Sequence, residues 1–76
     1  MTWDEFCKEI NNLNCHKIEV FLDHITLFLP ENGDEMHFFD SGIIDLYTFR
    51  KDCNTTIAMD ASYEDMRCII RGLCRG

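Results

Sequence analysis

The sequence predicts a two-layer α+β domain with an N-terminal helix, a five-stranded antiparallel meander sheet and a C-terminal helix. Apolar residues recur at helical spacing at both ends of the chain. Between Ile18 and Met59 they instead alternate with polar residues, and four turn signals interrupt the alternation. The 76 residues are enough for one small hydrophobic core. We therefore expect residues 1–76 to form a single domain.

A capping box predicts the start of the first helix. Thr2 is followed three residues later by Glu5, so the hydroxyl and the carboxylate can each accept a hydrogen bond from a backbone N–H that the helix leaves unpaired. The apolar stripe of this helix comprises Trp3, Phe6, Cys7, Ile10 and Leu13. Ser62, with Asp65 three residues later, starts the second helix. The stripe of that helix comprises Tyr63, Met66, Ile69, Ile70 and Leu73.

The turns predict how the strands pair. Two-residue turns are expected at Asp23-His24, Asn32-Gly33 and Lys51-Asp52, and a three-residue loop is expected at Asp40–Gly42. These turns pair Leu22 with Ile25, Leu29 with Met36, Phe38 with Ile44, Leu46 with Ile57 and Ile44 with Met59. In this register every aliphatic residue lies on one face of the sheet, and we expect both helices to cover that face.

Aromatic side chains are expected on the opposite face. The predicted register places there Phe21, Phe28, Phe39, Tyr47 and Phe49, with Thr26, His37, Asp45 and Thr56 between them. A chain of this length can bury one sheet face under its own helices, but hardly two. The second face is therefore expected to bind a partner or a second copy of the chain. Two alternatives remain open: one helix crosses to this side, or the rings shield one another.

The charge distribution favours a basic protein partner. The formal net charge is −7, and the segment from Ile18 to Phe49 holds seven acidic residues and no Lys or Arg. Exposed rings on a sheet are one way to bind RNA, but this sheet would repel the phosphates of a nucleic acid or an anionic membrane. The meander gathers four carboxylates at one end of the sheet: Glu31, Asp34, Glu35 and Asp52. These carboxylates either imitate phosphates or keep the hairpin ends solvated.

Neither a catalytic site nor a metal site is predicted. His37 and Asp45 are expected opposite each other, and a His–carboxylate pair can form half of a general-base unit. No Ser or Cys is expected beside them, so a cross-strand polar pair is the favoured interpretation. The cysteines lack metal-ligand spacing, although a zinc site built from Cys15, His16 and Cys53 remains an alternative. We therefore expect no enzyme, no cofactor and no bound metal.

The sequence also predicts a cytoplasmic protein. The apolar runs are too short for a transmembrane helix, and charged residues within the first ten positions argue against a signal peptide. In the cytoplasm five cysteines are expected to be free thiols: Cys7, Cys15, Cys53, Cys68 and Cys74.

Together these features predict a small acidic protein-binding module. We expect an inhibitor that occupies a surface of a nucleic-acid-handling protein, with the aromatic face and the acidic end of the sheet in contact. Size and charge, without any shared motif, make the chain comparable to phage-encoded inhibitors of host defence, including anti-CRISPR proteins, which would place it in the host cytoplasm. The alternative is a structural homodimer assembled through the aromatic face.

Overall fold

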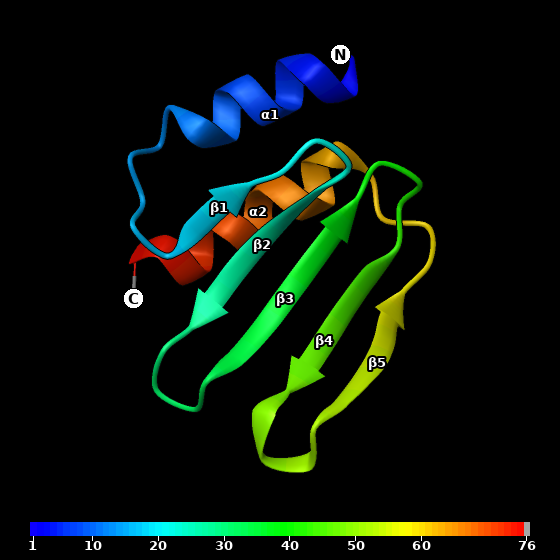
Figure 1. Ribbon diagram of the computed structural model, residues 1–76. Helices are drawn as coiled ribbons and strands as arrows, with labels where there is room; N and C mark the ends of the chain where they lie inside the picture. Colours follow the sequence, from blue (N-terminus) through cyan, green and yellow to red (C-terminus); the bar gives the residue numbers. More distant parts are fainter. Residues whose placement is uncertain (76) are drawn as a thin grey trace.

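The structure, a computed structural model that describes residues 1–75, contains the predicted helices and strands in the predicted order. The elements are α1 (Trp3–Asn11), β1 (Ile18–Val20), β2 (His24–Leu29), β3 (Asp34–Phe39), β4 (Ile44–Thr48), the 3₁₀ helix η1 (Phe49–Lys51), β5 (Cys53–Ala58) and α2 (Tyr63–Arg75). The five strands form one antiparallel sheet in the order β1-β2-β3-β4-β5, so each strand pairs with its neighbours in the chain (Figure 1).

Both helices pack on the same face of the sheet. α1 contributes Phe6 and Ile10 to the core, and α2 contributes Met66 and Ile70. The core residues of the sheet are Ile25, Leu27, Met36, Phe38 and Ile44. Figure 1 shows the sheet from its other face, with α2 behind β1 and β2. The predicted two-layer α+β architecture is thereby confirmed.

Hydrogen bonds confirm both predicted helix starts. The Glu5 N–H donates to Thr2 Oγ1 (3.2 Å), and the Thr2 N–H donates to Glu5 Oε1 (2.8 Å). At α2 the Asp65 N–H donates to Ser62 Oγ (3.0 Å), and the Ser62 N–H donates to Asp65 Oδ2 (3.1 Å). Each helix therefore begins with a reciprocal capping box that satisfies two backbone N–H groups.

Arg67 on α2 links the two helices. Its Nε donates to Glu9 Oε2 on α1 (2.5 Å), its Nη2 donates to Glu9 Oε1 (3.0 Å), and its Nη1 binds Glu64 on α2. The hydrogen bonds from Arg67 lower the pKa of Glu9, and those to Glu9 raise the pKa of Arg67. Because these side chains are partly exposed, the ion pairs orient the helices more than they stabilise the fold.

Three of the four predicted strand registers are wrong by two residues. The observed pairs include Val20 with Ile25, Leu27 with Met36, Phe38 with Ile44 and Leu46 with Thr55. The register between β3 and β4 is the one that agrees with the prediction. Successive side chains alternate between faces, so a shift of two residues leaves the paired strand residues between Ile18 and Thr56 on their predicted faces. The layers are therefore right although much of the pairing is not.

The first turn lies one residue earlier than predicted, which moves the register by two. The Phe21 N–H donates to the His24 carbonyl (2.8 Å), so the turn is centred on Leu22-Asp23 rather than Asp23-His24. His24 thereby becomes the first residue of β2. Leu22, a predicted partner of Ile25, is 97% exposed and does not contribute to the core.

The second and fourth turns take four residues instead of two. The β2–β3 loop spans Pro30–Gly33, where Gly33 takes a φ of 75° and its N–H donates to the Leu29 carbonyl (3.0 Å). A two-residue type I′ turn needs positive φ at both positions, but Asn32 does not adopt it. In the β4–β5 turn η1 is followed by Asp52 with a left-handed φ of 48°.

A β-bulge removes two predicted residues of β5 from the core. The register shifts by one between Ile44 and Asp45, and Ala58 becomes the residue of β5 that packs against the core. Ile57 and Met59 flank Ala58 and are 50% and 70% exposed. Their assignment to the aliphatic face is wrong, because a one-residue insertion exchanges the two faces of a strand.

Replacing Gly42 by Ala is expected to lower the free energy of unfolding by about 1–3 kcal/mol. Gly42 lies in the β3–β4 loop with a φ of 94°, and a Cβ there would lie 3.1 Å from the Ala61 carbonyl oxygen. Gly72→Ala in α2 is the matched control, since a Cβ at this position meets nothing within 4 Å among the described residues. Ala favours a helix over Gly, so this control is expected to gain up to about 1 kcal/mol. Denaturant titration measures both variants, and equal stabilities would contradict the loop conformation.

Candidate functional site

The sheet face opposite the helices, called the outer face below, is the candidate functional site. Figure 1 shows this face with no helix in front of it. Because α1 and α2 both pack on the other face, the alternative in which one helix crosses over is excluded. A row of polar residues crosses the outer face through all five strands: Glu19, Thr26, His37, Asp45 and Thr56. Aromatic side chains lie on both sides of this polar row.

The first aromatic cluster lies beside the β1–β2 turn. The His24 ring stacks on Phe21 with the centroids 4.6 Å apart, and on Phe39 with the centroids 5.6 Å apart. The His37 ring is tilted against His24 at 5.7 Å. His24 Nδ1 lies 2.7 Å from Asp23 Oδ1, and this hydrogen bond orients the ring and lowers the pKa of Asp23. Phe21 and Phe39, both predicted on this face, therefore contact each other through the His24 ring, which was predicted to lie in a turn.

The second aromatic cluster lies at the opposite end of the sheet. Phe28, Glu35 and Tyr47 are neighbours in register on β2, β3 and β4. Tyr47 Oη donates to Asp52 Oδ1 (2.7 Å), which raises the pKa of Tyr47. The same hydrogen bond holds the left-handed residue of the β4–β5 turn against the outer face.

Phe49 connects the two turns at this end. Its N–H donates to Asp34 Oδ1 (3.0 Å), and its ring packs over Gly33, where a Cβ would lie 3.3 Å from Phe49 Cγ. The β2–β3 and β4–β5 turns therefore lie together, as the meander predicts.

The predicted aromatic residues differ in position and exposure. Phe28, Phe39 and Tyr47 belong to strands, whereas Phe21 lies in a turn and Phe49 in η1. Phe39 and Tyr47 are half-buried, and Phe21, Phe28 and Phe49 are exposed. The alternative of mutual shielding therefore holds only for part of the set.

His37 and Asp45 lie opposite each other, as predicted, but each side chain has another partner. His37 Nε2 lies 3.0 Å from Glu35 Oε1, and Asp45 Oδ1 accepts a hydrogen bond from Thr56 Oγ1 (2.8 Å). These bonds run along β3 and between β4 and β5. His37 and Asp45 are therefore opposite in register but hydrogen-bond to separate partners rather than to each other.

The acidic end of the sheet carries charges of both signs. Three of its four carboxylates accept the hydrogen bonds described above, and Glu31 is exposed. Arg50 and Lys51 border the same surface hollow as Glu31 and Asp34. A count of charges between Ile18 and Phe49 misses these cations, because they follow Phe49 directly in the chain.

Three outer-face residues escaped prediction: His24, Ile57 and Met59. His24 was assigned to a turn, and its only sequence signal is its place directly after Asp23. Ile57 and Met59 are exposed on either side of the inward-packed Ala58. No turn residue or Gly marks the bulge that exchanges their face, so the alternation alone assigned them to the core.

The zinc site that the sequence left open is not assembled within residues 1–75. No group of three or more His, Cys, Asp or Glu side chains in this range could hold a metal ion, so the alternative zinc site of Cys15, His16 and Cys53 does not form. The Cys15 thiol instead lies near the Cys74 thiol at the end of α2. No helix in the same range is long and apolar enough to cross a membrane.

The thiols are expected to differ in reactivity. Burial, together with the nearby Cys15 thiol, raises the pKa of Cys74 to about 12, so this thiol stays protonated at mildly alkaline pH. Because the thiolate is the nucleophile, iodoacetamide at about pH 8 should modify the exposed Cys53 and Cys68 well before Cys74. Peptide mass spectrometry measures the rates, with denatured protein as the control in which they converge. Equal rates for Cys68 and Cys74 in the folded protein would contradict the thiol contact.

The outer face combines exposed rings with carboxylates, and this determines what it can bind. An aromatic ring attracts a cation through its π face, and a carboxylate forms strong hydrogen bonds with guanidinium or ammonium groups. The arrangement therefore suits Arg and Lys side chains of another molecule. No protein-family model, curated protein or solved structure matches this chain.

Proposed function

We propose that this protein is a small acidic binding module whose outer face covers a basic surface of another protein. The observation that supports this proposal is a sheet face with no helix over it and with exposed rings, although both helices pack on the other face. Burying an aromatic side chain removes about 150–250 Å² from water. Phe28 is 36% exposed, so a complex would remove from water the part of this area that the fold leaves exposed.

The contacts on the outer face indicate how a basic partner would be held. The two aromatic clusters would stack against Arg side chains, and the polar row between them offers the carboxylates of Glu19 and Asp45. Asp45 is held in place by Thr56, so its orientation is fixed before binding. A preorganised carboxylate beside rings loses little freedom on binding, which favours affinity.

We further propose that the partner handles nucleic acid and that the module inhibits it by occupying its nucleic-acid-binding surface. The net charge of −7 supports this proposal, because a phosphate-binding surface is basic. The cations Arg50 and Lys51 weaken the acidic end as a phosphate mimic, so the exposed Glu31 and the polar row would supply most of the charge. Such an inhibitor would act without a catalytic step or a cofactor, in the manner of a phage-encoded anti-defence protein in the host cytoplasm.

The structural homodimer through the outer face is the second candidate, and the polar row disfavours it. A two-fold face-to-face dimer would bring Glu19, Glu35 and Asp45 of one copy against the same acidic surface of the other. Like charges brought together in this way cost free energy, whereas a basic partner satisfies them.

Phe28→Asp is expected to weaken binding of the partner at least about tenfold, because it replaces an exposed ring of the outer face by a charge. The partner is captured from the source cell with immobilised wild type, identified, purified and titrated against each variant by calorimetry. Leu73→Asp is the matched control, since Leu73 on α2 has a similar exposure of 37% and lies away from the outer face. Equal affinities of the two variants would remove the outer face as the binding site.

If the module imitates phosphate, its affinity for the partner should fall as salt rises, and an oligonucleotide should compete with it. Glu31→Gln is expected to reduce the salt dependence, because it removes an exposed carboxylate at the acidic end. Asp60→Asn, at the other end of the sheet, is the control with the same change of charge. An affinity that does not change with salt or with added oligonucleotide would contradict the proposal that the module inhibits nucleic-acid binding. The proposal that it is a binding module would still stand.

A further inference from the structure

β5 leaves one side of its backbone unpaired among the described elements. It is the last strand of the sheet, pairs only with β4, and is exposed from Cys53 to Ile57. A free strand edge presents N–H and C=O groups that can pair with another strand. Figure 1 shows β5 standing clear of both helices.

The two edges of the sheet differ in protection. β1 has three residues and α1 packs beside it, so little of its edge is available. β5 has six residues, and neither Lys nor Pro occurs between Cys53 and Met59. Its bulge limits regular pairing to Cys53–Thr56, which still offers four residues for a ladder. β5 therefore lacks most of the devices by which proteins block an edge strand.

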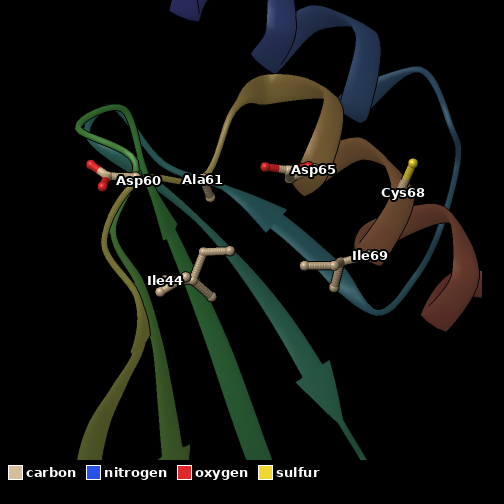
Figure 2. A pocket seen from close by; sticks show the side chains of 7 residues that line it. Ile44, Asp60, Ala61, Asp65, Cys68 and Ile69 are labelled. Atoms are coloured by element: carbon tan, nitrogen blue, oxygen red, sulfur yellow. The ribbon is translucent and has the colours of Figure 1, made fainter.

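Apolar surface lies next to this edge. Ile57 in β5 and Met59 directly after it are exposed. On the helix side an open hollow lies between β4, β5 and α2, and Figure 2 shows Ile44 and Ile69 pointing toward each other across it. A strand added to β5 would extend the sheet beside this hollow and shield it from water.

We propose that the occupant of this edge is a second copy of the chain, paired with β5 in antiparallel orientation about a two-fold axis. Each copy carries a net charge of −7, so two copies repel each other across most of their surfaces. The stretch from Cys53 to Met59 carries no charge, which makes it the place where two copies can approach. Antiparallel self-pairing over Cys53–Thr56 places the same four uncharged residues on both sides of the axis, so no charge is buried in the ladder.

The dimer would extend the sheet to ten strands and leave the outer face open. A two-fold axis through an antiparallel strand pair runs perpendicular to the sheet, so both helical layers lie on one side and both outer faces on the other. The dimer does not rest on the proposed function, but it would double the surface available to a partner. The two proposals can fail independently. The Ile57→Lys variant tests the dimer through the β5 edge, whereas the Phe28→Asp variant tests binding of a partner to the outer face.

Light scattering coupled to size-exclusion chromatography tests the dimer over micromolar to submillimolar concentrations. Wild type is expected at twice the chain mass at the upper end, and Ile57→Lys at the mass of one chain, because a Lys on an edge strand blocks pairing. Leu22→Lys is the matched control, since Leu22 is 97% exposed in the β1–β2 turn, and it should remain dimeric. Circular dichroism verifies that each variant is folded, and Asn54→Lys, at an exposed residue within the ladder, replaces Ile57→Lys if the latter does not fold.

The outcomes separate the possible occupants. Wild type that remains monomeric at every concentration would overturn the proposal and leave the edge to a strand of another protein. A dimer that dissociates with Phe28→Asp but not with Ile57→Lys would overturn it in favour of contact through the outer face. Loss of the dimer in Ile57→Lys, with both Leu22→Lys and Phe28→Asp still dimeric, would support it.

Discussion

One core holds this fold together, and the chain has enough apolar residues for only one. Phe6 and Ile10 from α1 and Met66 and Ile70 from α2 meet a single face of the sheet, and all four are fully buried. The capping boxes determine where the helices begin, and the Arg67 ion pairs orient the helices relative to each other. Both contribute less to the free energy of unfolding than the core does. The outer face is uncovered as a result, because both helices of residues 1–75 pack on the other face of the sheet.

The outer face shows how a small sheet keeps aromatic side chains in water without becoming a continuous apolar patch. The polar row divides the rings into two clusters, one around His24 and one around Tyr47. Within each cluster a hydrogen bond to a turn carboxylate, Asp23 or Asp52, orients a ring. The same side chains that limit non-specific association would also meet the basic partner proposed above.

The layers could be predicted from the sequence, whereas the loops could not. Alternation from Ile18 to Phe38 assigns each residue to a face, and this assignment survives any register shift of two residues. The centre of a turn is a local property of the backbone: Gly42 marks its loop correctly, but Asn32-Gly33 belongs to a longer turn than its sequence indicates. The alternation of apolar and polar residues predicts neither the bulge before Ala58 nor the position of the cations that follow Phe49. For the candidate site this means that Phe28, His37, Phe39, Asp45 and Tyr47 could be placed on one face, but their hydrogen-bond partners could not.

The strand order β1-β2-β3-β4-β5 has a consequence for the time course of folding. Every ladder joins segments that are adjacent in the chain, so each hairpin can close before distant parts of the protein meet. The contacts that span the greatest sequence distance join the N-terminal segment to α2, such as Arg67 with Met1, 66 residues apart, and Arg67 with Glu9, 58 residues apart. The sheet would therefore assemble from local hairpins within a short search, and the docking of the terminal helix onto the first one would complete the native state.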